Sequence, residues 1–234
     1  MPANQKYSSN EIRLDKALIV FVRYPEPGKV KTRLAKETNE NFACDVYKIW
    51  AENIFREVKP LKYFNNYVFY SEEKDEAKII KWTNNEFVYF PQQGNDLGER
   101  MLNAFRIVLN QQNQKAIIIG TDIPDLSKEI ILEAAGALDE NDIVIGPSYD
   151  GGYYLLGMKK VIPHLFQNVE WSSNSVFSST ISKARSTNLK LKELQPLHDI
   201  DTKEGLNNWL LETNNAELKR EILSLLEKNN ISNL

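Results

Sequence analysis

Apolar and polar residues follow two different periods along this chain, and their alternation predicts strands and helices in turn. The runs 17–22 and 116–120 are continuously apolar, which is typical of strands buried on both faces. The stretch 39–58 instead repeats its apolar residues at helical spacing. The same patterns predict further strands at 67–70, 87–90, 142–145, 152–157 and 189–194, and further helices at 72–82, 98–111, 127–138, 174–186, 202–212 and 215–228.

The order of these elements predicts the fold class. Strands that alternate with helices form a mostly parallel central sheet with helices on both faces, a three-layer α/β/α sandwich. No linker-like stretch divides the 234 residues, a length that one α/β domain can reach. We therefore expect a polar leader at 1–16 and a single domain at 17–234.

Composition narrows the range of partners. The net charge is −3, from 29 basic and 32 acidic residues, which argues against bulk electrostatic binding to nucleic acid. No apolar run approaches the roughly 18 residues that cross a membrane. The leader also lacks the apolar core of a signal peptide. These features predict a cytoplasmic protein without nucleic-acid or membrane partners, and they leave its oligomeric state open.

The loop at 23–33 follows the first strand, at the sheet edge where ligands bind in such folds. Its Gly28 permits an unusual turn. If the loop is extended, Lys29, Lys31 and Arg33 project to one side and suit a diphosphate. The alternative is a solvated basic loop. The spacing does not match a Walker A loop.

Carboxylates follow two other strands. Asp122 comes directly after 116–120, and Asp201 comes after 189–194. Mg²⁺ in proteins is bound by one or two carboxylates together with substrate phosphates. Alternatives remain for both residues, because Asp122 could cap a turn and Asp201 could begin a capping box in which Thr202 is the other candidate N-cap. Asp125 and Asp199 are further candidate ligands.

Two glycine-containing segments are candidates for binding the rest of a substrate. The segment 94–100 opens a helix, whose N-terminal amides suit an anion or ribose hydroxyls, although it could be only a loop and a cap. The segment 150–153 requires a close backbone approach, either in a tight turn or against a sugar. Trp171 lies in a polar loop, where an aromatic core residue is less expected.

Six segments in this order resemble the bacterial glycosyltransferase-A-like family of radical-SAM/selenodomain-associated transferases, over about residues 17–210. They are FVRYPEPGKVKTRLA (21–35), GNDLGERM (94–101), GTDIPDL (120–126), GPSYDGGYYLLG (146–157), VEWSS (169–173) and DIDTKEGL (199–206). The resemblance implies a nucleotide-diphospho-sugar transferase fold. More distantly, the pattern is similar to 2-phospho-L-lactate and molybdenum-cofactor guanylyltransferases. It implies that Lys29, Lys31 and Arg33 hold nucleotide phosphates and that Asp122 binds Mg²⁺ or Mn²⁺, with Asp201 as its partner.

The pattern departs from related enzymes in two respects. The G-x-G-T-R loop of sugar nucleotidylyltransferases is replaced by PEPGKVKTR, and Thr-Asp-Ile-Pro-Asp is not a strict Asp-x-Asp. We expect a metal-dependent glycosyltransferase that uses a nucleotide-diphosphate sugar and an unknown small acceptor. The alternatives are a nucleotidyltransferase that uses a nucleoside triphosphate, and a non-catalytic nucleotide-binding protein.

The expected site residues fall into three groups. Those for nucleotide and phosphate are Arg23, Gly28, Lys29, Lys31, Arg33, Asp96, Arg100 and Thr121. Those for the sugar or acceptor are Gly151, Gly152, Tyr153 and Trp171, with Asp150 as a catalytic general base. The metal ligands are Asp122 and Asp201.

Overall fold

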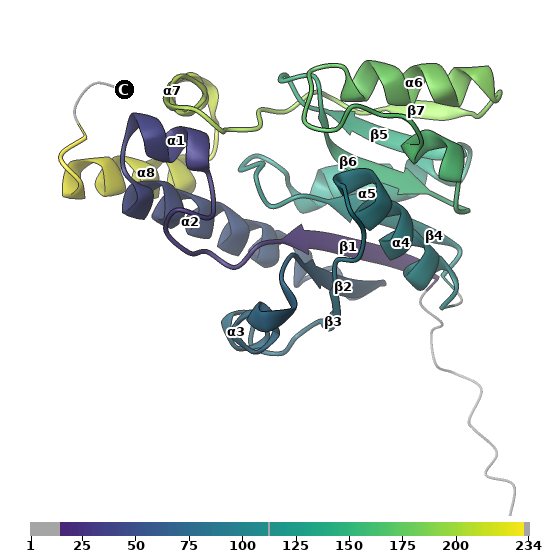
Figure 1. Cartoon of the computed structure of the whole chain (residues 1–234), viewed down its shortest axis with the longest axis horizontal. Coiled ribbons are helices and arrows are strands. Elements are labelled where there is room, and N and C mark those ends of the chain that lie inside the picture. The colour runs from purple at the N-terminus through teal and green to yellow at the C-terminus, as the bar shows by residue number, and fades with distance from the viewer. Residues whose placement is uncertain (1–14, 112, 232–234) are drawn as a thin grey trace, which may run out of the picture.

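A seven-stranded sheet with helices on both sides forms the centre of the computed structural model, which describes residues 15–111 and 113–231 (Figure 1). The strands are β1 Lys16–Val22, β2 Phe64–Tyr70, β3 Val88–Pro91, β4 Lys115–Ile119, β5 Ile143–Pro147, β6 Tyr153–Met158 and β7 Leu191–Glu193. The α-helices are α1 Thr32–Glu37, α2 Glu40–Val58, α3 Glu76–Trp82, α4 Leu97–Leu109, α5 Lys128–Ala137, α6 Val176–Ser186, α7 Lys203–Glu212 and α8 Ala216–Lys228. Two short 3₁₀ helices are η1 Glu73–Asp75 and η2 Pro163–Phe166.

The strand order is β3-β2-β1-β4-β6-β5-β7. Only β6 is antiparallel to its neighbours within the described sheet, and it pairs with both β4 and β5. The carboxyl ends of β1 and β4 lie side by side, because these strands pair in parallel with Val20 opposite Ile119. This topology confirms the expected mostly parallel α/β/α sandwich, and it brings the loops after β1 and β4 together.

Both faces of the sheet are buried, as the continuously apolar strands predict. Leu18 and Val20 of β1 are fully buried in one apolar cluster with residues of α2 and α5. Ile19 and Phe21 point to the opposite face and pack in a second cluster with residues of α4 and α6. The core therefore consists of two layers, one on each side of the sheet.

A third apolar cluster joins α1, α2, α7 and α8 beyond the carboxyl end of β1 (Figure 1). Trp50 of α2 and Trp209 of α7 are both fully buried, with ring centroids 6.2 Å apart in an edge-to-face arrangement. Such aromatic pairs favour a fixed geometry. The cluster therefore places the loop before α1 and the loop before α7 at the same end of the sheet.

The structure confirms the predicted strands and helices, with bounds that shift by at most three residues except at the start of the helix expected at 72–82, where the 3₁₀ helix η1 precedes α3. Residues 1–14 of the expected leader lie outside the described residues, and β1 begins at Lys16, inside the expected leader. The extended conformation considered for the loop at 23–33 is wrong, because helix α1 begins at Thr32 and the preceding Lys31 is left-handed, with φ 46° and ψ 46°. Among the described residues, no helix has both the length and the apolar character to cross a membrane.

Candidate functional site

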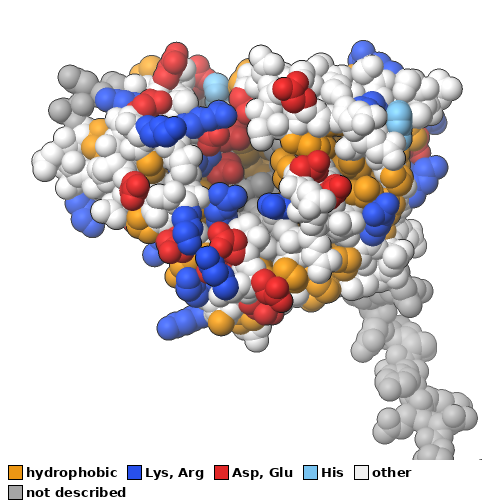
Figure 2. Space-filling model, viewed as in Figure 1, with side chains coloured by type: hydrophobic (Ala, Val, Ile, Leu, Met, Phe, Trp, Pro, Cys, Tyr) orange, Lys and Arg blue, Asp and Glu red, His pale blue; other side chains and the backbone are white. Residues whose placement is uncertain are grey.

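A cavity of about 880 Å³ opens at the carboxyl ends of β1 and β4. Figure 2 shows it as the hollow at the centre of the face, with acidic side chains on one wall, Lys and Arg at the rim and hydrophobic side chains opposite. The expected nucleotide residues that line it are Arg23, Lys31, Arg33, Arg100 and Thr121. The other expected residues that line it are Asp122, Asp150, Gly152, Tyr153, Trp171 and Asp201. The fold thus gathers eleven of the fifteen expected residues around one space, which lies within the usual 300–1,000 Å³ of ligand pockets.

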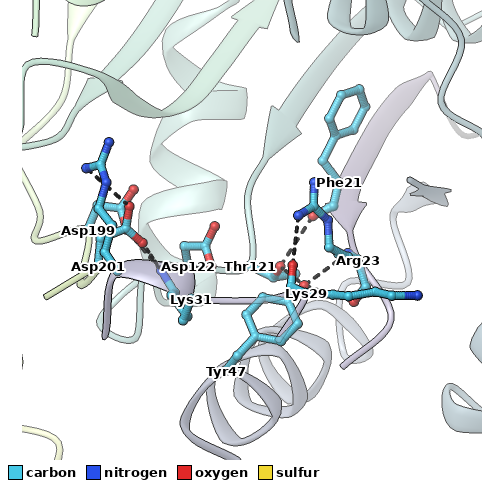
Figure 3. A network of polar contacts seen from close by, with 10 residues as sticks. Phe21, Arg23, Lys29, Lys31, Tyr47, Thr121, Asp122, Asp199 and Asp201 are labelled. Carbon is cyan, nitrogen blue, oxygen red and sulfur yellow. Dashed lines mark hydrogen bonds and ion pairs between the residues drawn. The ribbon is translucent and has the colours of Figure 1, made fainter. Parts of the chain in front are cut away.

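Three carboxylates converge on the ammonium of Lys31 at the floor of this cavity (Figure 3). Its Nζ lies 3.0 Å from Asp122 Oδ1, 3.2 Å from Asp199 Oδ1 and 2.8 Å from Asp201 Oδ1. The lysine side chain is only 2% exposed. We call Lys31 and these three aspartates the carboxylate cluster. The ammonium donates hydrogen bonds to Asp199 and Asp201, and Asp122 adds an ion pair.

The backbone and a buried aromatic ring fix Lys31 in this position. Its left-handed conformation is uncommon for a non-glycine residue and directs the side chain inward as α1 begins. The ammonium lies 5.5 Å from the centroid of the Trp50 ring, a favourable cation–π distance. Asp122 comes from the loop after β4, and the other two aspartates come from the loop before α7. The third apolar cluster therefore positions two of the three segments that meet here.

The close charges shift the titration of the cluster. Burial alone lowers the pKa of a lysine, but attraction to the three carboxylates raises the pKa of Lys31 above its ordinary value. Burial raises the pKa of the Asp199 carboxyl to about 7, and repulsion from Asp122 and Asp201 acts in the same direction, against the attraction of Lys31. Burial also acts to raise the pKa of Asp201, but attraction and a hydrogen bond from Lys31 lower it overall. The cluster thus holds more carboxylates than its one lysine neutralises.

Tyr47 of α2 ties together the loops after β1 and β4. Its hydroxyl accepts a hydrogen bond from the Arg23 backbone N–H at 3.0 Å and donates to the Arg23 carbonyl at 3.0 Å. It also lies 3.0 Å from Thr121 Oγ1, which is itself 3.4 Å from the Phe21 carbonyl. Burial and the nearby Asp122 raise the pKa of Tyr47, so the phenol stays neutral. The Thr121 hydroxyl therefore already has hydrogen-bond partners within the protein.

Three arginines line the cavity and differ in what they contact. Arg33 is two-thirds exposed, and its Nη1 lies 3.9 Å from Asp201 Oδ2. Arg23 donates through Nη1 to the Lys29 carbonyl at 2.9 Å. Arg100, in the first turn of α4, donates through Nε to the Gly94 carbonyl at 3.1 Å. The hydrogen bonds of Arg23 and Arg100 go to neutral carbonyls, so both guanidinium groups keep their charge available to an anion.

Four expected residues do not line the cavity: Gly28, Lys29, Asp96 and Gly151. Lys29 Nζ pairs with Glu26 at 3.1 Å, and its side chain points away from the aspartates (Figure 3). Asp96 is the N-cap of α4 and accepts a hydrogen bond from the Glu99 N–H at 2.8 Å. Each of these two polar side chains has a partner within the protein. This agrees with the non-functional alternatives that the sequence left open, a solvated basic loop at 23–33 and a helix cap at 94–100.

The structure decides which residue caps α7. The N-cap is Thr202, whose Oγ1 accepts a hydrogen bond from the Gly205 N–H at 3.0 Å. Asp201 therefore does not act as this cap, and its carboxylate faces Lys31 instead. Asp125 has structural partners, because it accepts hydrogen bonds from Trp209 Nε1 at 2.7 Å and Thr213 Oγ1 at 2.8 Å.

The turn at 150–152 packs against the loop before α6. A Cβ on Gly151, which has φ +89°, would lie 2.1 Å from the Asn174 carbonyl oxygen. The close approach expected at this turn therefore involves Asn174, a residue of the same chain. Asp150 Oδ1 accepts hydrogen bonds from Ser148 Oγ and from the Gly152 N–H, and its side chain remains exposed at the cavity.

The carboxylate cluster has the donor type that a hard cation requires, but an ammonium stands at its centre. Within residues 15–111 and 113–231, no group of three or more His, Cys, Asp or Glu side chains is arranged to hold a metal ion. The carboxylate oxygens converge on Lys31 Nζ at 2.8–3.2 Å, longer than the 2.0–2.1 Å typical of Mg²⁺ ligands. As arranged here, the oxygens hold the lysine in place of a metal.

Two residues of the site escaped the sequence-based assignment of roles. The sequence offers Asp199 only as a further candidate metal ligand, although it stands two residues before Asp201. Tyr47 follows the helical apolar spacing of α2, which marks it as a core residue and carries no sign of its polar contacts. A signal for Asp199 is present in the Asp-x-Asp spacing of 199–201, whereas none marks Tyr47.

Family comparison identifies relatives of the chain. A family model described as "Uncharacterized protein conserved in bacteria (DUF2064)" matches residues 54–173. No curated protein matches the chain. The chain is similar to a solved structure described as a "putative nucleotide-diphospho-sugar transferase" from Desulfovibrio desulfuricans G20, at 30% identity and a TM-score of 0.86, over 93% of this chain and 96% of that one.

More distant structures share the fold alone. One is the 4-diphosphocytidyl-2C-methyl-D-erythritol synthase of Anaerococcus prevotii DSM 20548, at 12% identity and a TM-score of 0.55, over 89% of this chain and 97% of that one. Another is a Mycobacterium tuberculosis H37Rv protein in complex with manganese, at 9% identity and a TM-score of 0.51, over 85% of this chain and all of that one. The fold is thus one that nucleotide-diphospho-sugar transferases and cytidylyltransferases share.

Proposed function

Because the chain belongs to the bacterial DUF2064 family and has a transferase fold, we propose that it is a metal-dependent glycosyltransferase that uses a nucleotide-diphosphate sugar. One observation carries the proposal: the convergence of Asp122, Asp199 and Asp201 at the carboxyl ends of β1 and β4, inside the cavity. Ligands of open α/β sheets bind at this edge. The sequence motifs further support membership in the radical-SAM/selenodomain-associated group of transferases.

The donor phosphates lie, in this proposal, between the carboxylate cluster and the arginines. Arg23, Arg33 and Arg100 supply charge-assisted hydrogen bonds to the phosphate oxygens. Asp122 and Asp201 would hold Mg²⁺ or Mn²⁺, and the bound ion would supply positive charge beside the leaving nucleoside diphosphate. Without added cations the cluster would repel a diphosphate, since its carboxylates outnumber its lysine.

The acceptor occupies the opposite half of the cavity. The aromatic side chains of Tyr153 and Trp171 line the cavity, and aromatic rings suit contact with a sugar ring. Asp150 is the proposed general base, held by Ser148 and the Gly152 N–H in a fixed orientation. Its exposure keeps it available to an incoming hydroxyl.

A ligand panel with Mn²⁺ tests the proposal. Nucleotide-diphosphate sugars and nucleoside triphosphates are added separately, and the melting temperature and released products are measured. A ligand at 100 times its Kd should stabilise the protein by about 2.7 kcal/mol. Release of a nucleoside diphosphate from a nucleotide sugar would support the glycosyltransferase. Release of pyrophosphate from a nucleoside triphosphate would instead indicate a nucleotidyltransferase. Binding without turnover would indicate a non-catalytic nucleotide-binding protein.

Two substitutions locate the ligand that the panel identifies. Arg33→Ala should raise its Kd by at least tenfold, because a hydrogen bond to a charged group is worth about 1.5–3 kcal/mol. Lys29→Ala is the matched control, since this neighbouring cation pairs with Glu26 and does not line the cavity. Equal calorimetric affinities of wild type and Arg33→Ala would contradict the assignment of the phosphates to this cavity.

A further inference from the structure

The ammonium of Lys31 occupies the point at which a divalent cation would meet the three carboxylates. Each of the three aspartates directs its Oδ1 atom at Lys31 Nζ, within 3.2 Å. A metal ligated by the same oxygens would have to lie almost where the ammonium lies. Two cations cannot share this space, because they repel each other and compete for the same lone pairs.

The position of Lys31 is built into the fold and does not depend on a flexible side chain reaching in from solvent. The side chain is 2% exposed and packs over the Trp50 ring. Its backbone adopts a left-handed conformation that non-glycine residues adopt only where the surroundings impose it. The neighbouring Lys29 is 40% exposed and pairs with Glu26 at 3.1 Å, outside the carboxylate cluster. The loop thus places one of its two lysines inside the cluster and the other outside.

We propose that Lys31 is an intramolecular competitor of the divalent cation, an inference that rests on the proposed function. Lys31 neutralises and holds together the carboxylates while the metal is absent. The metal binds only when the ammonium leaves the shared oxygens. The measured metal affinity is then the intrinsic affinity multiplied by the fraction of molecules in which Lys31 has left these oxygens. Once displaced, the ammonium stays at the cavity wall, where it can face the phosphates of the donor.

Calorimetric titration with Mn²⁺ alone tests this competition in three versions of the full chain. Lys31→Met keeps the length of the side chain and removes the ammonium, so it should bind Mn²⁺ at least about tenfold more tightly than wild type, a difference of about 1.4 kcal/mol. Lys29→Met removes a lysine two residues away and should bind like wild type. A Lys31→Met protein that binds Mn²⁺ no more tightly than wild type would overturn the competition and leave the metal-dependent function standing. Absence of Mn²⁺ binding by every version would overturn both.

A second measurement needs no variant and covers the case in which Lys31→Met fails to fold. Wild-type protein is treated briefly with acetic anhydride at increasing Mn²⁺ concentration, and the acetylation of each lysine is measured by mass spectrometry. Without Mn²⁺, Lys31 should be protected while Lys29 reacts. Acetylation of Lys31 should then rise along the Mn²⁺ binding curve, with Lys29 constant as the internal reference. A Lys31 that stays protected when Mn²⁺ is bound would overturn the inference.

Discussion

A single hydroxyl group, that of Tyr47, joins the segments on which the site is built. It contacts the Arg23 backbone after β1 and the Thr121 side chain after β4, and it extends from α2. Tyr47 and Thr121 are buried, and the hydrogen bonds to the Arg23 backbone are partly buried, so water replaces these bonds poorly. The relative position of the two loops therefore depends on this residue.

Tyr47→Phe should lower the free energy of unfolding by about 1–3 kcal/mol, because it leaves the Arg23 N–H and carbonyl without their partner. Urea unfolding measures the change. Tyr63→Phe is the control, since Tyr63 is 70% exposed and a surface substitution usually changes stability by less than about 0.5 kcal/mol. Equal losses in both variants would show that the buried hydrogen bonds of Tyr47 contribute nothing specific.

The sequence predicts the residues of the site better than their roles. Asp122 and Asp201 could be placed because each follows a predicted strand, and parallel strands bring their carboxyl ends to one edge. The sequence also places Lys31 at that edge, but it does not predict the ion pairs of Lys31 with the aspartates. These ion pairs depend on the left-handed conformation of Lys31 and on loops 170 positions apart. Nothing in the local pattern shows such long-range contacts.

At the scale of elements, the strongly periodic segments were predictable and α1 was not. Helix α2 has 19 residues and a continuous apolar face, whereas α1 has only six residues and follows a loop that contains two prolines. A helix this short is stabilised by its tertiary contacts more than by its own sequence. Leu34 supplies that contact, since it is fully buried in the third apolar cluster.

Helix α4 and the loop that carries Trp171 are in close contact beside the cavity. Gly98 stands in the first turn of α4, and a Cβ there would lie 2.2 Å from the Trp171 ring. Only glycine allows the indole to approach the helix this closely. The first turn of α4 and the loop that carries Trp171 therefore form one wall of the cavity together.

Gly98→Ala should destabilise the protein by about 1–3 kcal/mol, because the added methyl group forces the indole or the helix to move. Gly136→Ala in α5 is the control: its Cβ would meet nothing within 4 Å, so the protein should gain roughly 0.5–1 kcal/mol from better helix propensity. In a Trp171→Ala background the loss at Gly98 should disappear. A loss that persists there, measured by the same urea unfolding, would contradict the steric explanation.

At the scale of the whole molecule, α2 connects the sheet to the helices at its carboxyl end. Ala51 and Ile54 pack in the cluster on one face of the sheet, while Val46 and Trp50 pack in the cluster with α7 and α8. One helix thus contributes to two cores. This arrangement supports the proposal that residues 17–234 fold as one domain. It also makes the site depend on α7 and α8, the last two helices of the described chain.

A cavity made far from the sheet tests this coupling. Ile222 of α8 is fully buried in the third cluster, so Ile222→Ala should lower the free energy of unfolding by about 2–5 kcal/mol. If the chain is one cooperative unit, amide hydrogen exchange should lose the same free energy of protection in β1 as in α8. Leu223→Ala is the control, because this neighbouring side chain is 42% exposed and its loss should leave both segments nearly unchanged. Protection that falls in α8 while β1 stays as in wild type would show that the carboxyl-terminal helices unfold separately, and the single domain would have to be divided between the sheet and the helices that complete its site.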